Sequence, residues 1–477
     1  MSKFFCLMGN EWKKELSKGA LKIMLIFLAV VSLAHPFLEY VGFSSMLVPY
    51  EQSFYDFYSS EIAWCEQMLE EGKSDEESMD YFRTELEIYR IMLDAEMDYD
   101  DWRYERDLAR LAVQERQAGN EAGYRDWMHV ITSNDEKAYF SLLKKNYGVL
   151  YANDPARLAV YEEAMDLCIE REIIPSHAAD WRYGQVEIYM QSSDDALMQQ
   201  RLRDAGSSWN EETLEEAINL AAVAKYRLEN NVAVNPADSF SPRFDAALYA
   251  MGGLFYEVSG GSEFWNAAVN SVTLLLLVGV FAIVIAGTTV ASEFSSGTVR
   301  LLLICPVKRW KILFSKYATA LLIMLGMTAA VFSLSLIAAA FCGIGDALLP
   351  AVCAANGEVY TVSPYLLLLR EYGYELVGMT VMMTVAFSLS TLTRAPAMAI
   401  GISVLMGAFG TALSALLQGV GIDAGRYLLF SNLDLKGIIE GTAVYPHQTV
   451  GAAVLVILLH MAVLLLTAYD AFVRREI

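Results

Sequence analysis

The sequence predicts an all-α membrane protein with six transmembrane helices and a large, mainly helical domain outside the membrane. Two observations lead to this fold class: the length of the apolar segments and the uneven distribution of charge. Of the 477 residues, 55% are hydrophobic and 19% are charged, and 44 of the 57 acidic residues lie between Tyr40 and Phe264. A single soluble globule is excluded because the apolar segments are too long and too many. Disorder of most of the chain is excluded because Leu, Ile, Val and aromatic residues are abundant.

Six apolar segments reach or approach the roughly 20 residues that a helix needs to cross about 30 Å of hydrocarbon. The second and third contain no Asp, Glu, Lys or Arg, which is not typical of buried helices in a soluble core. For the first, a cleaved signal peptide is an alternative, but about 22 residues precede its apolar run, more than a signal peptide usually has there. The segments are Ala20–Leu38, Trp265–Val290, Tyr317–Phe341, Leu376–Thr393, Ala395–Leu417 and Val450–Ala468.

Basic residues near the ends of these segments predict the orientation of the chain. With an even number of crossings, all the basic groups lie on one side, which is expected to be the cytoplasm of a plasma-membrane protein with both termini inside. The predicted parts are an N-terminal helix with the first transmembrane helix at 1–39, an extracellular acidic helical domain at 40–264, and transmembrane helices 2–6 at 265–477. The basic residues are Lys3, Lys13, Lys14, Lys18, Arg300, Lys308, Arg309, Lys311, Lys316, Arg394, Arg474 and Arg475.

The acidic block is predicted to form long helices packed as hairpins. Apolar residues recur there at steps of three and four, which places them on one face of a helix. Three Ser-x-x-Glu boxes predict helix starts, because both side chains satisfy amide groups that a helix start leaves without partners. One apolar stripe consists of Met79, Phe82, Leu86, Tyr89 and Leu93, and the boxes are Ser74 with Glu77, Ser133 with Glu136 and Ser208 with Glu211. The aromatic residues expected in the core include Trp102, Tyr104, Trp127, Trp181 and Tyr183.

A four-residue motif occurs twice in this block. Asp-Trp-Arg-Tyr stands at residues 101–104 and again at 180–183. The flanking residues match poorly, so a duplicated helical unit and convergent packing both stay open. A place in the core is the preferred interpretation for the two tryptophans, and a binding role is the alternative.

No motif for catalysis, nucleotide binding or zinc binding occurs in the chain. The chain is therefore not expected to be an enzyme or to hold a metal or cofactor, and it shows no basic surface for nucleic acid. Acidic residues are almost absent from the predicted transmembrane helices, which argues against a proton relay. Bridges between Cys65 and Cys168 or between Cys342 and Cys353, and free thiols, all stay open.

The connector between the second and third transmembrane helices is the most informative stretch. Glu293 ends the apolar segment, and the Ser-Ser-Gly sequence at 295–297 permits a sharp change of direction. Residues 298–304 are expected to form a short amphipathic helix, which Pro306 cannot continue. The basic and aromatic residues at 308–311 are expected at the lipid surface.

In this connector the sequence resembles the membrane subunit of ABC-2 type transporters. The resemblance extends to the N-terminal stretch Asn10–Lys18, similar to the family's membrane-surface helix, to the six-helix plan, and to Tyr427–Leu433, where the family has short re-entrant helices. It implies a coupling helix at about 293–310 and a re-entrant segment at about 419–446. A large outer domain after the first helix occurs only in some branches, so the substrate stays open. The residues that carry the resemblance are Glu293, Gly297-Thr298, Pro306, Lys308-Arg309 and Lys316.

The resemblance implies that two such membrane subunits, identical or paralogous, pair in the lipid bilayer with two separate ATPase subunits that bind ATP and Mg. The expected function is ATP-driven export of a peptide-like or amphipathic compound. The alternative is a non-transporting membrane sensor or scaffold whose outer domain binds an envelope ligand. The residues expected to couple to the ATPase, rather than to form a mere interfacial loop, are Glu293, Gly297, Thr298, Val299, Arg300, Leu301 and Pro306.

Overall fold

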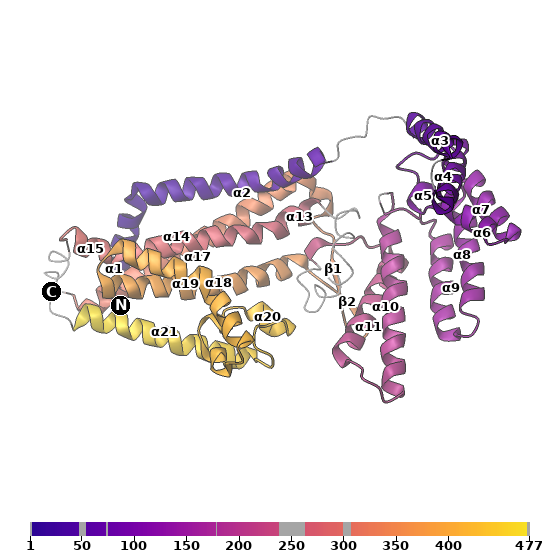
Figure 1. The fold of residues 1–477 in the computed structure, drawn as a ribbon. Coiled ribbons are helices and arrows are strands. Elements are labelled where there is room, and N and C mark those ends of the chain that lie inside the picture. Colours follow the sequence, from indigo (N-terminus) through magenta and orange to yellow (C-terminus); the bar gives the residue numbers. More distant parts are fainter. Residues whose placement is uncertain are drawn as a thin grey trace.

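The molecule is elongated, with a bundle of long apolar helices at one end and a helical domain at the other (Figure 1). The computed structural model describes residues 2–46, 54–72, 75–177, 179–237, 263–298 and 307–474. The first and last helices bring both ends of the chain to the end of the bundle that lies away from the helical domain (Figure 1).

Six helices among the described residues are long and apolar enough to cross a membrane, which confirms the predicted fold class. The second of these spans is assembled from four pieces, and the third continues from a long helix into the short helix η4 (Ile344–Asp346). The pieces are α13 (Glu263–Asn270), η3 (Ser271–Leu274), α14 (Leu275–Thr289) and α15 (Ala291–Ser295). The other spans lie in α2 (Gly19–Met46), α17 (Arg309–Gly343), α18 (Pro364–Thr393), α19 (Pro396–Gly419) and α21 (Val450–Val473).

The centre of the bundle is formed by α14 and α18. In the most apolar stretch of each of these two helices, 61% of the residues are buried inside the protein. The corresponding share is 17% in α19 and 11% in α21. The apolar side chains that α19 and α21 leave exposed suit lipid, because backbone groups inside these helices are already hydrogen-bonded. The core between the central helices includes Leu275, Val278, Met324, Met383 and Phe387.

Helix α18 is longer than the fourth predicted segment and contains two acidic residues. This helix begins at Pro364, twelve residues before the predicted start at Leu376. It therefore includes Glu371, which is buried, and Glu375. Proline is favoured in the first turn of a helix, and this explains the early start. The Glu371 carboxylate lies 3.8 Å from the Lys436 ammonium, so the buried charge is paired.

The acidic domain is a stack of helical hairpins, as predicted. Neighbouring helices in the chain pack against each other, and the hairpins share one apolar core. Of the expected core aromatics, Trp102, Trp127 and Tyr183 are buried, whereas Tyr104 and Trp181 are half-buried. The helices are α3 (Phe54–Glu71), α4 (Glu76–Asp94), α5 (Trp102–Glu105), α6 (Leu108–Gln117), α7 (Glu121–Ser133), α8 (Glu136–Leu150), α9 (Pro155–Glu170), α10 (Trp181–Asp204) and α11 (Glu211–Asn230).

The residues predicted to cap three of these helices are wrong, although the helix starts are close to the predicted positions. The caps are Asp75 on α4, Asp135 on α8 and Asn210 beside the start of α11, each accepting a hydrogen bond from a backbone amide. Ser133 is instead the last residue of α7, and Ser74 lies outside the described residues. Asp and Asn are at least as good as Ser at this position, and an ionised carboxylate is the stronger acceptor.

The two Asp-Trp-Arg-Tyr motifs adopt the same local structure. In each, the aspartate caps the following helix, and its carboxylate also pairs with the arginine two residues later. Each arginine then donates to carbonyl groups at the end of the preceding long helix: Arg103 to Ala95 (3.2 Å) and Arg182 to Arg171 (2.9 Å). The motif therefore links the end of one helix to the start of the next, which is a structural role.

A β-hairpin connects the acidic domain to the membrane bundle. Strands β1 (Ala351–Ala355) and β2 (Glu358–Val362) are antiparallel and lie between α17 and α18. Their turn, Asn356-Gly357, has positive φ at both residues (52° and 80°), as a two-residue hairpin turn requires. The Gly357 amide donates to the Asn219 side chain on α11 (2.8 Å), and Asn235 donates to the Leu349 carbonyl (2.8 Å). The domain is thus held to the bundle by contacts besides the chain itself (Figure 1).

The segment between α19 and α21, which contains the predicted re-entrant region, is compact. It holds three short helices that side chains tie together. Ser431 donates to the Gly425 carbonyl (2.7 Å), and Asn432 donates to the Leu428 carbonyl (2.7 Å). The helices are η5 (Asp423–Tyr427), η6 (Phe430–Asn432) and α20 (Leu435–Glu440).

Cys65 and Cys168, for which a disulfide bridge was one alternative, are free thiols buried in the acidic domain. Burial raises the pKa of both thiols, and for Cys65 the neighbouring carboxylates Glu61 and Glu85 add to the effect. A protonated, enclosed thiol is a poor nucleophile, so these two cysteines act as small core residues.

Candidate functional site

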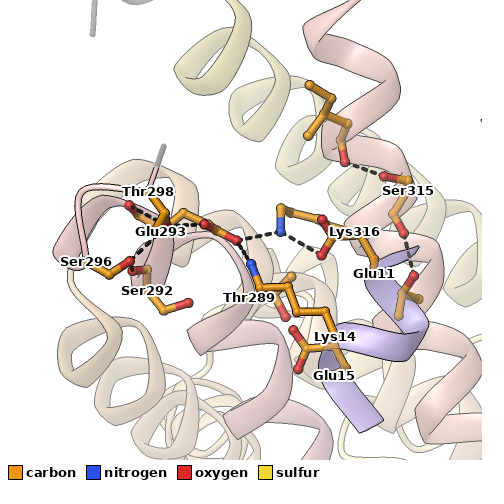
Figure 2. Close-up of polar contacts among 12 residues, drawn as sticks. Glu11, Lys14, Glu15, Thr289, Ser292, Glu293, Ser296, Thr298, Ser315 and Lys316 are labelled. Carbon is orange, nitrogen blue, oxygen red and sulfur yellow. Dashed lines mark hydrogen bonds and ion pairs between the residues drawn. The ribbon is translucent and has the colours of Figure 1, made fainter. Parts of the chain in front are cut away.

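The candidate site lies where the connector meets the N-terminal helix, at the end of the bundle that carries both termini (Figure 1). Helix α1 (Ser2–Ser17) places Leu7 and Trp12 against the apolar core of the bundle. Its charged residues at 11, 14 and 15 are spaced by three and four residues, so they lie along one side of the helix. Figure 2 shows that this side faces α15 and α17.

Glu293 is the centre of the site. Glu293 is only 4% exposed. Its carboxylate accepts hydrogen bonds from Lys14 on α1, from Thr298 in the connector and from Lys316 on α17 (3.1 Å). Lys316 is 1% exposed and also donates to Glu11 on α1 (2.8 Å). Figure 2 shows the four charged side chains in a row, Lys14, Glu293, Lys316 and Glu11. We call these four residues the Glu293 cluster.

The Glu293 cluster is electrically neutral, with two ammonium groups and two carboxylates. Removing charges from water is costly, and their mutual attraction compensates for this only when every charge is paired. Breaking such a buried pair by deleting one partner typically costs about 3–5 kcal/mol. The cluster therefore holds α1, which is distant in the sequence, in one fixed arrangement with the connector and α17.

The turn after Glu293 is fixed by its backbone and by side chains. Gly297 has φ = 74°, in the left-handed region that only glycine enters without a steric penalty. This conformation brings the Thr298 hydroxyl back to the Glu293 carboxylate and to the Ser296 hydroxyl (2.9 Å). The connector therefore starts from a defined geometry (Figure 2).

Lys14 remains protonated in this setting. Partial burial opposes its charge, but the hydrogen bond and the charge of Glu293, together with Glu11 and Glu15, outweigh that effect and raise the pKa of Lys14. A neighbouring pair, Lys18 with Glu15 (2.7 Å), extends the row of charges along α1.

Three of the residues predicted to couple to an ATPase, Glu293, Gly297 and Thr298, come together in this site. The other four, Val299, Arg300, Leu301 and Pro306, lie outside the described residues. The site also contains residues that the sequence prediction missed. Glu11 and Lys14 were not singled out as site residues, and Lys316 was noted as a basic residue of the connector and as part of the resemblance, but not as a site residue.

Two features of the sequence could have revealed these partners. The acidic and basic residues of α1 alternate at helical spacing, and Lys316 directly precedes an apolar run of 25 residues without charge, Tyr317–Phe341. A lysine on the buried side of a membrane helix needs an acidic partner nearby. Among the described residues, no group of His, Cys, Asp and Glu is arranged to hold a metal ion.

Comparison with known proteins assigns the membrane half of the chain to a protein family. A family profile described as "Protein of unknown function (DUF2705)" matches residues 240–477. The uncharacterized protein YhcI of Bacillus subtilis (strain 168) is 30% identical over 220 residues, which are 46% of this chain and 70% of that protein. The chain belongs to the DUF2705 family.

A second relative supports the membrane assignment of this DUF2705 protein. The uncharacterized membrane protein YdbK of the same organism is 25% identical over 206 residues, which are 43% of this chain and 80% of that protein. With its six candidate spans, the chain is a multi-pass membrane protein. The family match includes Glu293 and Lys316 and leaves α1 and the acidic helices outside. No solved structure matches the chain.

Proposed function

We propose that the chain is the membrane-spanning subunit of an ATP-driven exporter of the ABC-2 type, which forms the translocation pathway as a dimer and is coupled to separate ATPase subunits. The observation that carries the proposal is the Glu293 cluster, which locks the connector to α1 and α17. The resemblance of the connector to the coupling helix of ABC-2 transporters adds to it.

A connector that transmits force has to be joined stiffly to the helices it moves. If the connector shifted alone, Glu293 would leave the two ammonium groups that pair with it, and Lys316 would keep only Glu11. Because that separation costs several kcal/mol, α1 and α17 move with the connector. An ATPase that favours one position of the connector therefore favours one arrangement of the bundle.

In this proposal the chain contributes no catalytic residue and no cofactor site. ATP and Mg are bound by the partner ATPase, which contacts residues 293–310 on the cytoplasmic side, where both termini lie. The second membrane subunit is a copy or a paralogue of this chain. The exported compound is peptide-like or amphipathic, a class that suits the exposed Met and Phe side chains of the bundle, such as Met398 and Phe409 on α19.

Copurification tests the proposal directly. The tagged full-length chain is isolated from its native membranes in mild detergent, and ATP hydrolysis is measured in the eluate. We expect an ATPase to copurify with the wild type and its recovery to fall about threefold or more with Glu293→Gln. The matched control is Asp470→Asn, because Asp470 forms an exposed pair with Arg474 (3.2 Å) in the last turn of α21. A wild-type preparation without any ATPase would rule out the proposal.

Labelling of intact cells tests the orientation. A cysteine introduced by Ser296→Cys is exposed in the turn, so it should react with a membrane-impermeant maleimide only after the cells are permeabilised. The comparison variant is Tyr81→Cys, which places a cysteine at an exposed position of α4 and should react in intact cells. Reaction of the Ser296→Cys variant in intact cells would place the connector outside and contradict the coupling role.

The alternative function is a non-transporting sensor or scaffold whose outer domain binds an envelope ligand. The hairpin β1–β2 favours this alternative. It lies between the membrane helices α17 and α18 and contacts α11 of the outer domain, so it connects the two parts. The two functions share the same topology. They differ in the copurification experiment, since a sensor of this kind has no ATPase partner.

A further inference from the structure

His177 lies between α5 and α10, which belong to the first and second halves of the acidic domain, and is outside the site described above. It precedes the second Asp-Trp-Arg-Tyr motif, and its partner Glu105 directly follows the first. The Glu105 carboxylate accepts from the His177 backbone amide (3.1 Å) and lies 2.8 Å from Nδ1 of the ring. On the other side of the ring, Nε2 lies 2.8 Å from the Glu187 carboxylate on α10.

The positions of the two carboxylates define the protonation state that this arrangement requires. A neutral imidazole carries one N–H group, so it donates to one acceptor only, and its second nitrogen presents a lone pair. Here both ring nitrogens face carboxylate oxygens at 2.8 Å. Both contacts are hydrogen bonds only when the ring is an imidazolium ion, because a neutral ring carries a proton for one of them only.

The other groups around the ring fit a single positive charge at His177. Arg106 is the second cation: it pairs with Glu105 (2.6 Å) and Glu187 (3.2 Å), and one of its nitrogens lies 3.2 Å from Nδ1. The Tyr183 ring packs edge-on against His177, and its hydroxyl accepts from Arg106 (3.2 Å). Two carboxylates and two cations balance when His177 is protonated, and one negative charge remains in excess when it is not.

We propose that His177 is a proton-operated clamp that joins the loop before α10 to the end of α5 and so couples the two halves of the acidic domain. Below the ordinary titration range of histidine the clamp is closed. When the proton is lost, Nε2 keeps its hydrogen bond to Glu187, Nδ1 accepts only from Arg106, and the ring no longer holds the loop to Glu105. This device responds to the pH of the compartment that surrounds the domain.

The direction of the titration agrees with the geometry. The hydrogen bond to Glu187 raises the pKa of His177; burial opposes this, and the bond to Glu105 adds to the increase. A group whose pKa is higher in the folded than in the unfolded state stabilises the fold fully at pH values below its unfolded pKa, about 6.5 for histidine. That contribution is lost as the pH rises through the folded pKa, so the clamp opens above pH 6.5 and not below it.

Hydrogen exchange of the full-length protein in detergent tests the clamp. Exchange is followed between pH 6 and 9 in peptides that cover α5 and residues 171–177, after correction for the intrinsic pH dependence of amide exchange. We expect the opening of these peptides in the wild type to increase with pH, by up to about tenfold for each unit between the folded and unfolded pKa values. In His177→Gln the peptides should be open at all pH values, and in the control His129→Gln, at an exposed position on α7, the wild-type profile should remain.

Ring resonances of labelled histidine provide a second measurement if His177→Gln does not fold. The His177 signal should titrate at a higher pH in the folded protein than after unfolding in urea. Glu187→Gln should move that midpoint down, because the largest stabilising partner loses its charge. A His177 signal that titrates at the unfolded midpoint, or an exchange profile that is the same in His177→Gln and wild type, would overturn the proposal.

Discussion

The two ends of this molecule both join distant helices through clusters of opposite charges, but they differ in what those charges are. The Glu293 cluster contains lysine and glutamate only, and its central residues are almost completely enclosed. The cluster of His177, Glu105, Arg106 and Glu187 in the acidic domain, the His177 cluster, is partly open to solvent. The second cluster depends on a histidine, the side chain that ordinarily titrates near physiological pH, whereas the first contains none. One joint is therefore permanent, and the other is conditional.

The largest effect is expected from removing the enclosed cation. Lys316→Ala leaves Glu293 with Lys14 and Thr298 as partners and removes the ammonium group that pairs with Glu11 in the cluster. We expect a loss of about 3–5 kcal/mol in the free energy of unfolding of the bundle. Thermal denaturation of the detergent-solubilised protein measures it, with Lys308→Ala as control because Lys308 is exposed just before α17. Equal melting temperatures for the two variants would show that the Glu293 cluster does not hold the bundle together.

A smaller and unequal effect is expected from the two motif arginines of the acidic domain. Arg103 is buried and donates to the Ala95 and Ile131 carbonyls, whereas Arg182 is half-buried and donates at the end of α9. Arg103→Ala leaves buried carbonyl groups unpaired, at about 1–3 kcal/mol, and Arg182→Ala should cost less because water reaches its partners. Hydrogen exchange at the ends of α4 and α9 gives the two values. A larger cost for Arg182→Ala would contradict the assigned burial.

The turn of the connector should show an effect of about 1–2 kcal/mol. Gly297→Ala introduces a Cβ at φ = 74°, where the space is open and the backbone conformation itself is strained. The matched control is Gly326→Ala, which also meets no atom within 4 Å but lies inside α17, where alanine is favoured. We expect Gly297→Ala to lower the melting temperature and Gly326→Ala to leave it unchanged or raise it. The reverse order would show that the left-handed turn is not present.

The sequence predicts the spanning helices well because their physical requirement is local. About 20 apolar residues without charge have no other stable place, so Tyr317–Phe341 is recognisable without any knowledge of its neighbours. Helical hairpins in the acidic block follow in the same way from apolar spacing. The Asn356-Gly357 turn is also a local feature, and this pair between apolar residues could have predicted the hairpin β1–β2.

The Glu293 cluster could not be predicted in the same way, because it depends on tertiary contacts. The spacing of Glu11 and Lys14 shows that they share one side of α1, but not that α15 and α17 cover this side. Their partners are separated from them by 279 and 305 residues in the chain. The predictions of the caps on α4 and α8 failed for another reason. Serine and a nearby aspartate can both accept from the same backbone amide groups, and the stronger acceptor, aspartate, occupies the cap position.

The smallest expected effect is the pH dependence of the Glu293 cluster. Because Glu293, together with Glu11 and Glu15, raises the pKa of Lys14 despite its partial burial, the stabilisation from this lysine is complete below the unfolded value of about 10.4 and is lost only above it. Peptides from α1 should therefore exchange equally between pH 6 and 9 after intrinsic correction, while peptides at 171–177 change in the same sample. A parallel change at both places would mean that the two clusters do not differ in kind, and that the pH response belongs to the whole protein.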